Sequence, residues 1–414
     1  MRRVIATFGV LATAAFAAAG CGGDSGGGPA TIRFYGGPEN SGALDKAVAD
    51  CSKQSGGKYN ISFEKLPADA DGQREQLVRR LAAEDDGIDL INMDVIWTAE
   101  FAEAGWIQPW EGANEKAAID GVLEGPLRTV RYGGKVYGAP FNTNTQLLWY
   151  RGDLVKSPPK TWEEMISQAK EIGGKAGHVL VQGKQYEGLT VWFNSLVASA
   201  GGSILKEGGD EASLGEPALK ALETMKQVAT QVGDPSLSNQ AEDETRLAFQ
   251  EGNAAFMVNY SFVYPSAKEE APKIYKNMKW APWPTLKEGE PAHVTIGGYN
   301  IGVSKFTKHK DEAFAAAKCL LKRKNQKDIA LKAGLPPVLA DLYDDPEIKK
   351  ANPFIDDVKT SLREASVRPP TPAYNDVSLA IQKSLSPPRS IDPKATLEEL
   401  SGKIDDALNS RGLL

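Results

Sequence analysis

The alternation of short strands and amphipathic helices over residues 31–101 constrains the fold more than any other feature of the chain. Each strand candidate is bounded by Gly, Pro or polar residues, and each helix candidate repeats apolar residues at intervals of three and four. Strands are expected at residues 31–35, 59–66 and 89–93, with helices near 42–55 and 73–83. A strand–helix–strand–helix–strand order is typical of a parallel sheet covered by helices, so the predicted fold class is α/β.

A second body is expected after the first, because 414 residues exceed what one hydrophobic core organises. Strand candidates at residues 131–137 and 146–150 lead out of the first body. The second body is expected to hold helices near 161–172, 189–201, 216–232 and 243–251. Ligands of open α/β sheets bind at loops that leave the carboxyl ends of strands, so these loops are where a site is expected.

The N-terminus is typical of an exported protein. A basic Met1-Arg2-Arg3 precedes an uncharged apolar run over residues 4–20 that ends in small residues. A helix of this length spans about 25 Å, short of a hydrocarbon core of about 30 Å. Residues 1–20 are therefore predicted to be a cleaved signal peptide rather than a membrane span.

The residues around the predicted cleavage point resemble a lipoprotein signal. Ala18-Ala19-Gly20-Cys21 is similar to a bacterial lipobox, in which the Cys is acylated and becomes the new N-terminus, although the usual motif has Leu where Ala18 stands. Two acyl chains would anchor the protein stably to the outer face of the cytoplasmic membrane. An ordinary secretory signal with an incidental Cys is the alternative. Residues 21–30, rich in Gly, are expected to form a flexible leash.

Charge and histidine content argue against several classes of function. The chain has 48 Lys and Arg against 54 Asp and Glu, a net charge of −6, so no nucleic-acid partner is expected. The three histidines are far apart in the sequence: His178, His293 and His309. No metal site, no Ser/His/Asp triad and no cofactor are therefore expected.

Two cysteines remain outside the predicted anchor, Cys51 and Cys319. In an oxidising compartment such a pair suggests one disulfide. Two buried free thiols are the alternative, because Cys is often simply buried.

Several polar residues follow the predicted strands. Glu39 and Asn40 come after the first strand, where they either touch a ligand or cap the next helix. Asp94 ends a buried strand, and its carboxylate either accepts two sugar hydroxyls or caps a helix. Asn144 lies at the first apparent crossover, and its amide offers both a donor and an acceptor to a hydroxyl.

Other candidates are aromatic residues near loops and one arginine. Tyr186, Tyr260 and Tyr299 are placed to stack on a pyranose ring. Gly298 allows the backbone to approach a ligand closely. Arg368 precedes Pro369-Pro370 in a stiff, extended segment that suits a planar fork of donors.

Longer motifs make the chain similar to the extracellular carbohydrate-binding proteins of ABC importers, of the maltodextrin-binding type. The strongest part is Gly134-Lys135-Val136-Tyr137-Gly138-Ala139-Pro140, followed by Asn144 and by Leu148-Trp149-Tyr150. Pro159-Lys160-Thr161-Trp162-Glu163-Glu164 adds to the match, which runs from about residue 31 to the C-terminus. The Ala/Gly-rich lipoprotein signal and the Gly-Gly-Pro-Glu-Asn loop at 36–40 are similar to those of trehalose-binding members of this family.

The resemblance implies a non-catalytic, monomeric protein that captures a disaccharide, trehalose, by hinge closure and delivers it to a membrane permease. It also implies a two-lobe, type II periplasmic-binding-protein fold with three hinge crossings and a cleft between the lobes. Lobe 1 would comprise residues 31–143 and 262–321, and lobe 2 residues 144–261 and 322–414. In this topology Cys51 and Cys319 both belong to lobe 1, where they are predicted to form a disulfide.

The resemblance further implies the residues that line the cleft. Lobe 1 would contribute Glu39, Asn40, Gln73 and Asp94, and the hinge Asn144. Tyr186, Glu187, Tyr260 and Arg368 would come from lobe 2 or its hinges, and Gly298, Tyr299 and Asn300 from the returning strand. Many relatives have Trp where this chain has Tyr299, so stacking is less firmly implied there.

Two other classes of function remain open at this point. A surface-anchored glycoside hydrolase needs two carboxylates about 5 to 10 Å apart, one of them with a raised pKa. A binding protein for another solute would take maltose or a glycerophosphodiester, and the latter would require a basic cleft.

Overall fold

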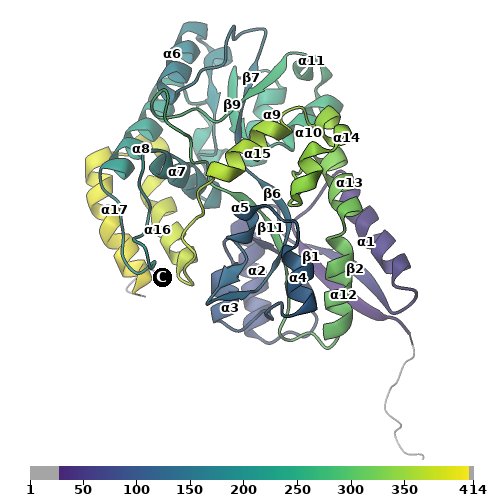
Figure 1. The fold of residues 1–414 in the computed structure, drawn as a ribbon. Helices are drawn as coiled ribbons and strands as arrows, with labels where there is room; N and C mark the ends of the chain where they lie inside the picture. Colours follow the sequence, from purple (N-terminus) through teal and green to yellow (C-terminus); the bar gives the residue numbers. More distant parts are fainter. Residues whose placement is uncertain (1–27, 410–414) are drawn as a thin grey trace, which may run out of the picture.

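The computed structural model of the chain describes residues 28–409 and shows two lobes, one above the other in Figure 1. The predicted signal peptide at 1–20, the predicted lipidation site Cys21 and most of the predicted leash lie outside these residues. Within residues 28–409, no helix is long and apolar enough to cross a membrane.

The first lobe is built on a five-stranded sheet in the order β2-β1-β3-β11-β6. These strands are β1 (Ala30–Gly36), β2 (Tyr59–Lys65), β3 (Leu90–Asp94), β6 (Ala139–Asn144) and β11 (Gly297–Val303). β1 runs parallel to β2 and β3, whereas β11 runs antiparallel to β3 and β6. The prediction of an α/β fold that begins with a parallel sheet is confirmed.

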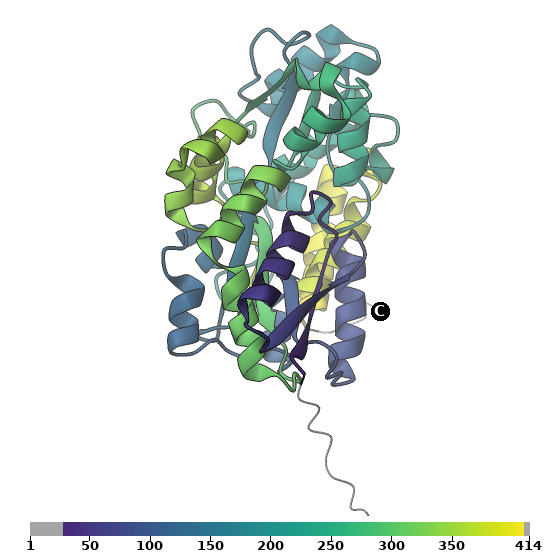
Figure 2. The same ribbon diagram turned by 90° about the vertical axis from the view of Figure 1, so that its right-hand side faces the viewer.

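Helices on both sides of this sheet bury its apolar residues (Figures 1 and 2). They are α1 (Ala43–Gln54), α2 (Ala70–Ala82), α3 (Thr98–Glu103), α4 (Ala113–Ile119), α5 (Glu124–Leu127), α12 (Lys310–Leu320) and α13 (Arg323–Ala333). The predicted strand at 131–137 is instead a two-stranded hairpin, β4 (Arg131–Tyr132) and β5 (Lys135–Val136). Gly133 and Gly134 form its turn with φ of 52° and 78°, a geometry that glycine adopts without strain.

The second lobe has a four-stranded sheet in the order β10-β7-β9-β8. Its strands are β7 (Leu147–Arg151), β8 (Val179–Leu180), β9 (Phe256–Asn259) and β10 (Met278–Ala281). Around it lie α6 (Trp162–Ile172), α7 (Glu187–Ser199), α8 (Glu216–Gln227), α9 (Glu242–Gln250), α10 (Val263–Glu270), α11 (Pro272–Tyr275), α14 (Pro346–Ala351), α15 (Ile355–Glu364), α16 (Tyr374–Leu385) and α17 (Pro393–Leu408). α16 and α17 pack beside α7 and α8 at the left of Figure 1.

Three segments connect the lobes. The first lies between β6 and β7, next to the predicted boundary at 143/144. The second leads into β11 through Thr295, which pairs with Ser366 of the segment between α15 and α16. The third follows α13, where the backbone N–H of Thr143 donates to the carbonyl of Pro336 at 3.1 Å.

Two of the predicted lobe boundaries are wrong. Residues 262–296 do not return to lobe 1, because β10 pairs with β7 in the second sheet. The return to lobe 1 starts only with β11. Residues 323–333 were expected in lobe 2, but α13 packs on lobe 1, where Ile329 joins the core that contains α1. Lobe 1 therefore takes its second segment from about 297 to 333.

The predicted disulfide is confirmed. Cys51 of α1 and Cys319 of α12 are bonded, with their Cα atoms 5.8 Å apart and a sequence separation of 268. Both are buried in the core of the first lobe. The bond therefore joins the N-terminal segment of that lobe to the segment that returns to it.

Candidate functional site

The candidate site lies between the lobes, where strands of both sheets end. Asp94 is the last residue of β3, and Tyr299 of β11 is directly opposite it in the sheet. On the second lobe, Tyr260 follows β9, and α7 begins at Glu187. The position agrees with the rule that open α/β sheets bind ligands at strand ends.

Arg368, with 4% of its surface exposed, lies at the centre of this interface. Its Nη1 donates a hydrogen bond of 2.7 Å to Oε1 of Glu187 on the second lobe. Its Nη2 lies 3.5 Å from Oδ1 of Asp94 on the first lobe and donates to the carbonyl of Ile296 at 3.3 Å. One guanidinium therefore links a carboxylate of each lobe.

Glu187 is held rigidly behind this arginine. Its Oε1 also accepts from the hydroxyl of Tyr374 at 2.6 Å, and its Oε2 accepts from Ser378 at 2.6 Å. Both of these partners belong to α16. Because both carboxylate oxygens have partners on the second lobe, Glu187 orients Arg368 rather than offering a free oxygen to a ligand.

Asp94 is only partly used by the protein. Its Oδ1 accepts from the backbone N–H of Ile96 at 3.1 Å, in the turn before α3, so Asp94 does not cap that helix. Within residues 28–409, Oδ2 makes no hydrogen bond and stays available to a ligand. Burial raises the pKa of Asp94, the charge of Arg368 opposes this, and Glu187 adds to it.

Three predicted tyrosines line the same interface. Burial raises the pKa of Tyr186, Tyr260 and Tyr299, so their hydroxyls stay neutral donors. The ring of Tyr186 folds over Gly188, where a Cβ would lie 2.1 Å from the Tyr186 hydroxyl. Gly188 therefore has to be glycine for Tyr186 to take this position.

Four of the predicted residues carry a buried polar atom without a hydrogen-bond partner among the described residues: Gln73 Oε1, Asn144 Oδ1, Tyr186 Oη and Arg368 Nε. Leaving such an atom unpaired costs about 1 to 3 kcal/mol, so a polar ligand that paired with it would recover that cost. Two glycines make room for the amides: a Cβ would lie 2.6 Å from Gln73 Nε2 if placed on Gly37, and 2.3 Å from Asn144 Oδ1 if placed on Gly297.

Other predicted residues serve the fold. The Glu39 carboxylate accepts from the backbone N–H of Ser41 at 2.5 Å and of Leu44 at 3.1 Å, so it caps α1, and Asn40 is exposed. Asn300 is buried and its Nδ2 donates to Thr129 Oγ1 at 3.1 Å. Gly298 has φ of 122°, and a Cβ there would lie 2.3 Å from the carbonyl oxygen of Asn142.

Sequence reasoning missed three acidic or aromatic residues of this interface. Burial raises the pKa of Asp71 to about 7, with Glu187 and Asp69 adding to the effect. Burial also raises the pKa of Glu242 to about 6. Tyr374 lies six residues after Arg368 and Asp71 two residues before Gln73, so both are close in sequence to residues that were predicted.

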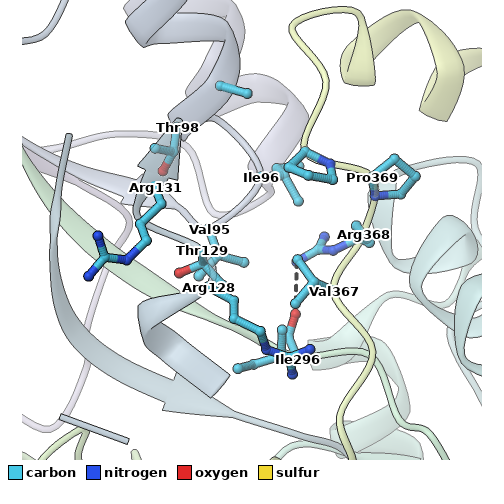
Figure 3. A pocket seen from close by; sticks show the side chains of 12 residues that line it. Val95, Ile96, Thr98, Arg128, Thr129, Arg131, Ile296, Val367, Arg368 and Pro369 are labelled. Carbon is cyan, nitrogen blue, oxygen red and sulfur yellow. Dashed lines mark hydrogen bonds between the residues drawn. The ribbon is translucent and has the colours of Figure 1, made fainter. Parts of the chain in front are cut away.

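A small pocket continues from Arg368 along the hinge (Figure 3). It is lined by Val95, Ile96, Thr98, Ala99, Arg128, Thr129, Arg131, Ile296, Val367, Arg368, Pro369 and Pro370. Arg128 ties the first lobe to the hinge, because its Nη2 donates to the carbonyl of Ala365 at 2.8 Å.

The interface as a whole carries more acid than base. Asp94 and Glu187 contact Arg368, whose pKa stays above its ordinary value although burial opposes the charge, and Asp71 and Glu242 are two further buried acids. With tyrosine hydroxyls and side-chain amides added, the site offers hydrogen bonds to a hydroxyl-rich molecule and electrostatic repulsion to an anion.

Comparison with known proteins assigns the family. The model of the bacterial extracellular solute-binding proteins matches residues 38–327, which is more than half of the chain. The chain belongs to this family. The resemblance seen in the sequence is thereby confirmed, and with it an extracellular, exported class of protein.

This solute-binding protein is 28% identical to a probable ABC transporter-binding protein of Deinococcus radiodurans, over 78% of this chain and 80% of the relative. It is 26% identical to a maltotriose-binding protein of Pyrococcus abyssi, over 74% of this chain and 68% of the relative. Its structure is similar to the maltose-bound MalE3 of T. maritima, with a TM-score of 0.84, 27% identity, and coverage of 91% of this chain and 99% of the other. The two-lobe fold is confirmed by this similarity.

Proposed function

We propose that this solute-binding protein captures a neutral disaccharide, trehalose, and delivers it to the permease of an ABC importer. The observation that carries the proposal is the cluster of Arg368, Glu187 and Asp94, which joins the lobes beside unpaired buried polar atoms. Its relatives support a sugar, since one is named for maltotriose and one similar structure holds maltose. The choice of trehalose is based on the similarity of the lipoprotein signal and of the loop at 36–40 to those of trehalose-binding members of the family.

The proposed mechanism is closure about the hinge. A sugar in the cleft would contact Asp94 of the first lobe and Tyr186 and Tyr260 of the second at the same time. Because these contacts coexist only when the lobes meet, binding energy shifts the population from open to closed. The permease would then recognise the closed form. The protein is proposed to act as a monomer.

The charge of the cleft favours a neutral sugar over a glycerophosphodiester. A phosphodiester would need a free cation, whereas Arg368 is bound to Glu187 at 2.7 Å. A non-catalytic role is supported by the use of both Glu187 oxygens by the protein's own side chains, since a hydrolase needs its carboxyls free to react.

Calorimetric titration with trehalose, maltose, sucrose and glycerophosphocholine tests the proposal. We expect heat with trehalose and none with the phosphodiester. A matched incubation that measures released glucose tests catalysis, and we expect no release. Binding of the phosphodiester alone, or turnover of any sugar, would refute the proposed function.

The proposal includes a lipid anchor on Cys21. Metabolic labelling with a fatty acid in a bacterial host tests it, with Cys21→Ala as the comparison. We expect label and membrane association in the parent chain and a released, unlabelled protein in the variant. Equal labelling of both would show that Cys21 carries no lipid.

A further inference from the structure

A chain of buried hydrogen bonds runs through the second lobe. Its members are Gln146, Gln182, Thr245 and Asn259, none of which exposes more than 1% of its surface. Nε2 of Gln146 donates to Oε1 of Gln182 at 2.6 Å. Nε2 of Gln182 donates in turn to the backbone carbonyl of Val258 at 3.0 Å and to Oγ1 of Thr245 at 3.3 Å.

The other end of this chain holds Tyr260. Oγ1 of Thr245 accepts from Nδ2 of Asn259 at 2.9 Å, and Oδ1 of Asn259 accepts from the backbone N–H of Tyr260 at 2.7 Å. Asn259 is the last residue of β9, and Leu147, the first residue of β7, is directly opposite it in the sheet. Because Gln146 precedes β7 and Tyr260 follows β9, both ends of the chain lie at the edge of the second sheet where the candidate site is.

The orientation of each amide is fixed by a group that can only accept. The carbonyl of Val258 has no proton to donate, so Gln182 presents its Nε2 there and its Oε1 to Gln146. Gln146 then presents its Nε2 to that oxygen, which turns its own Oε1 away from Gln182. Flipping one amide, or both, would bring two donors or two acceptors face to face.

Oε1 of Gln146 is the open end of the chain. In the part of the protein that the structure describes, it is buried and has no hydrogen-bond partner. The other polar side-chain atoms of the four residues all have partners. Asn144, two residues earlier in the same crossing between the lobes, also keeps a buried oxygen unpaired. Buried polar atoms are usually paired, so unpaired acceptors in this crossing indicate a donor that a ligand supplies.

We propose that Gln146 is a further specificity-determining residue of the sugar site, and that its Oε1 accepts a hydrogen bond from one hydroxyl of the bound sugar. The inference rests on the proposed function for its ligand. Because Gln182 prevents the amide from turning, this position accepts only a group that donates. A hydroxyl fits it, whereas a methoxy group or a hydrogen atom leaves the oxygen unpaired.

Calorimetry with trehalose and with monodeoxy trehaloses, each lacking one hydroxyl of one glucose ring, tests the proposal. We expect the parent chain to bind several of these analogues more weakly than trehalose, including the one that lacks the hydroxyl bound by Gln146. That loss should be about tenfold. Gln146→Met keeps the length of the side chain and removes the amide. In this variant trehalose should bind about tenfold more weakly, and one of the parent's losses should disappear while the others remain.

Gln227→Met is the matched control, because it makes the same substitution on the exposed face of α8. It should bind trehalose and every analogue like the parent chain. If Gln146→Met alone does not fold, the double variant with Gln182→Met takes its place, since it removes both partners of the buried hydrogen bond at once. The double variant should lose the same single discrimination.

A residue that only supports the fold would weaken the binding of every sugar by the same factor. Such a uniform loss, or discrimination in Gln146→Met unchanged from the parent chain, would overturn the inference and leave the proposed function standing. If maltose or sucrose bound in place of trehalose, its monodeoxy analogues would serve as the series. A parent chain that bound none of these disaccharides would refute the proposed function and this inference together.

Discussion

Replacing Arg368 by Lys is the most informative single substitution, because it keeps the positive charge and removes the planar guanidinium with its several donors. The guanidinium makes contacts in three directions, to Glu187, Asp94 and the carbonyl of Ile296. An ammonium group is a compact charge that cannot hold this planar arrangement. We therefore expect a lysine at position 368 to hydrogen-bond to Glu187 but not to Asp94 at the same time.

The magnitude follows from the burial of these groups. Breaking a buried ion pair by removing one partner costs about 3 to 5 kcal/mol, because the other charge stays buried. Arg368→Ala should therefore lower sugar affinity by at least about 100-fold, since about 1.4 kcal/mol corresponds to a factor of ten. Arg368→Lys should fall within about tenfold of Arg368→Ala.

Calorimetric titration with trehalose at about 20 mM and about 500 mM NaCl measures both variants. A neutral sugar has no long-range attraction to screen, so affinity should be nearly equal at the two salt concentrations. Arg363→Ala, on the exposed surface of α15, serves as the control and should bind like the parent chain. Rescue by Lys together with strong salt dependence would refute the reasoning, because the site would then be selecting a negative charge.

Three further predictions concern the scaffold and the cleft. Replacing Cys51 and Cys319 by Ser should lower the free energy of unfolding by about 3 to 5 kcal/mol, measured by denaturant titration; an unchanged midpoint would contradict a stabilising disulfide. Asp94→Ala should lower sugar affinity at least about tenfold in calorimetry with an unchanged circular dichroism spectrum, since a charged acceptor is lost. Gly297→Ala should weaken sugar binding by displacing Asn144, because its Cβ would lie 2.3 Å from Asn144 Oδ1; parent-like affinity would exclude Asn144 from the site.

Local patterns predicted the fold well where neighbours in sequence are neighbours in space. The parallel arrangement of β1, β2 and β3 follows from the strand–helix rhythm, and the helices of the second lobe follow from apolar periodicity. The lobe boundary at residue 262 was wrong because β10 takes its partner, β7, from a distant part of the chain. Strand pairing over such a separation leaves no periodic signal.

Only part of the candidate site was predicted, because some of its residues have a local signal in the sequence and others depend on distant parts of the chain. Asp94 was predicted because it ends a buried strand and Arg368 because it precedes two prolines, and the structure brings their side chains to 3.5 Å. Glu39 was also predicted to touch a ligand or to cap a helix, and in the structure its carboxylate caps α1. Sequence alone does not decide between these two roles. Asp71 was missed because burial in the folded chain raises its pKa, and sequence alone does not show which acids become buried.

The disulfide also determines how the protein responds to a cut in its backbone. Cys51 and Cys319 enclose the whole of the second sheet, from β7 to β10, within one covalent loop. A protease that nicks the exposed turn around Gly208, on the surface of the second lobe, would leave two fragments still bonded to each other. The nicked molecule would run as one band on a gel without reductant and as two with it, so damage to this lobe would not release it from the other.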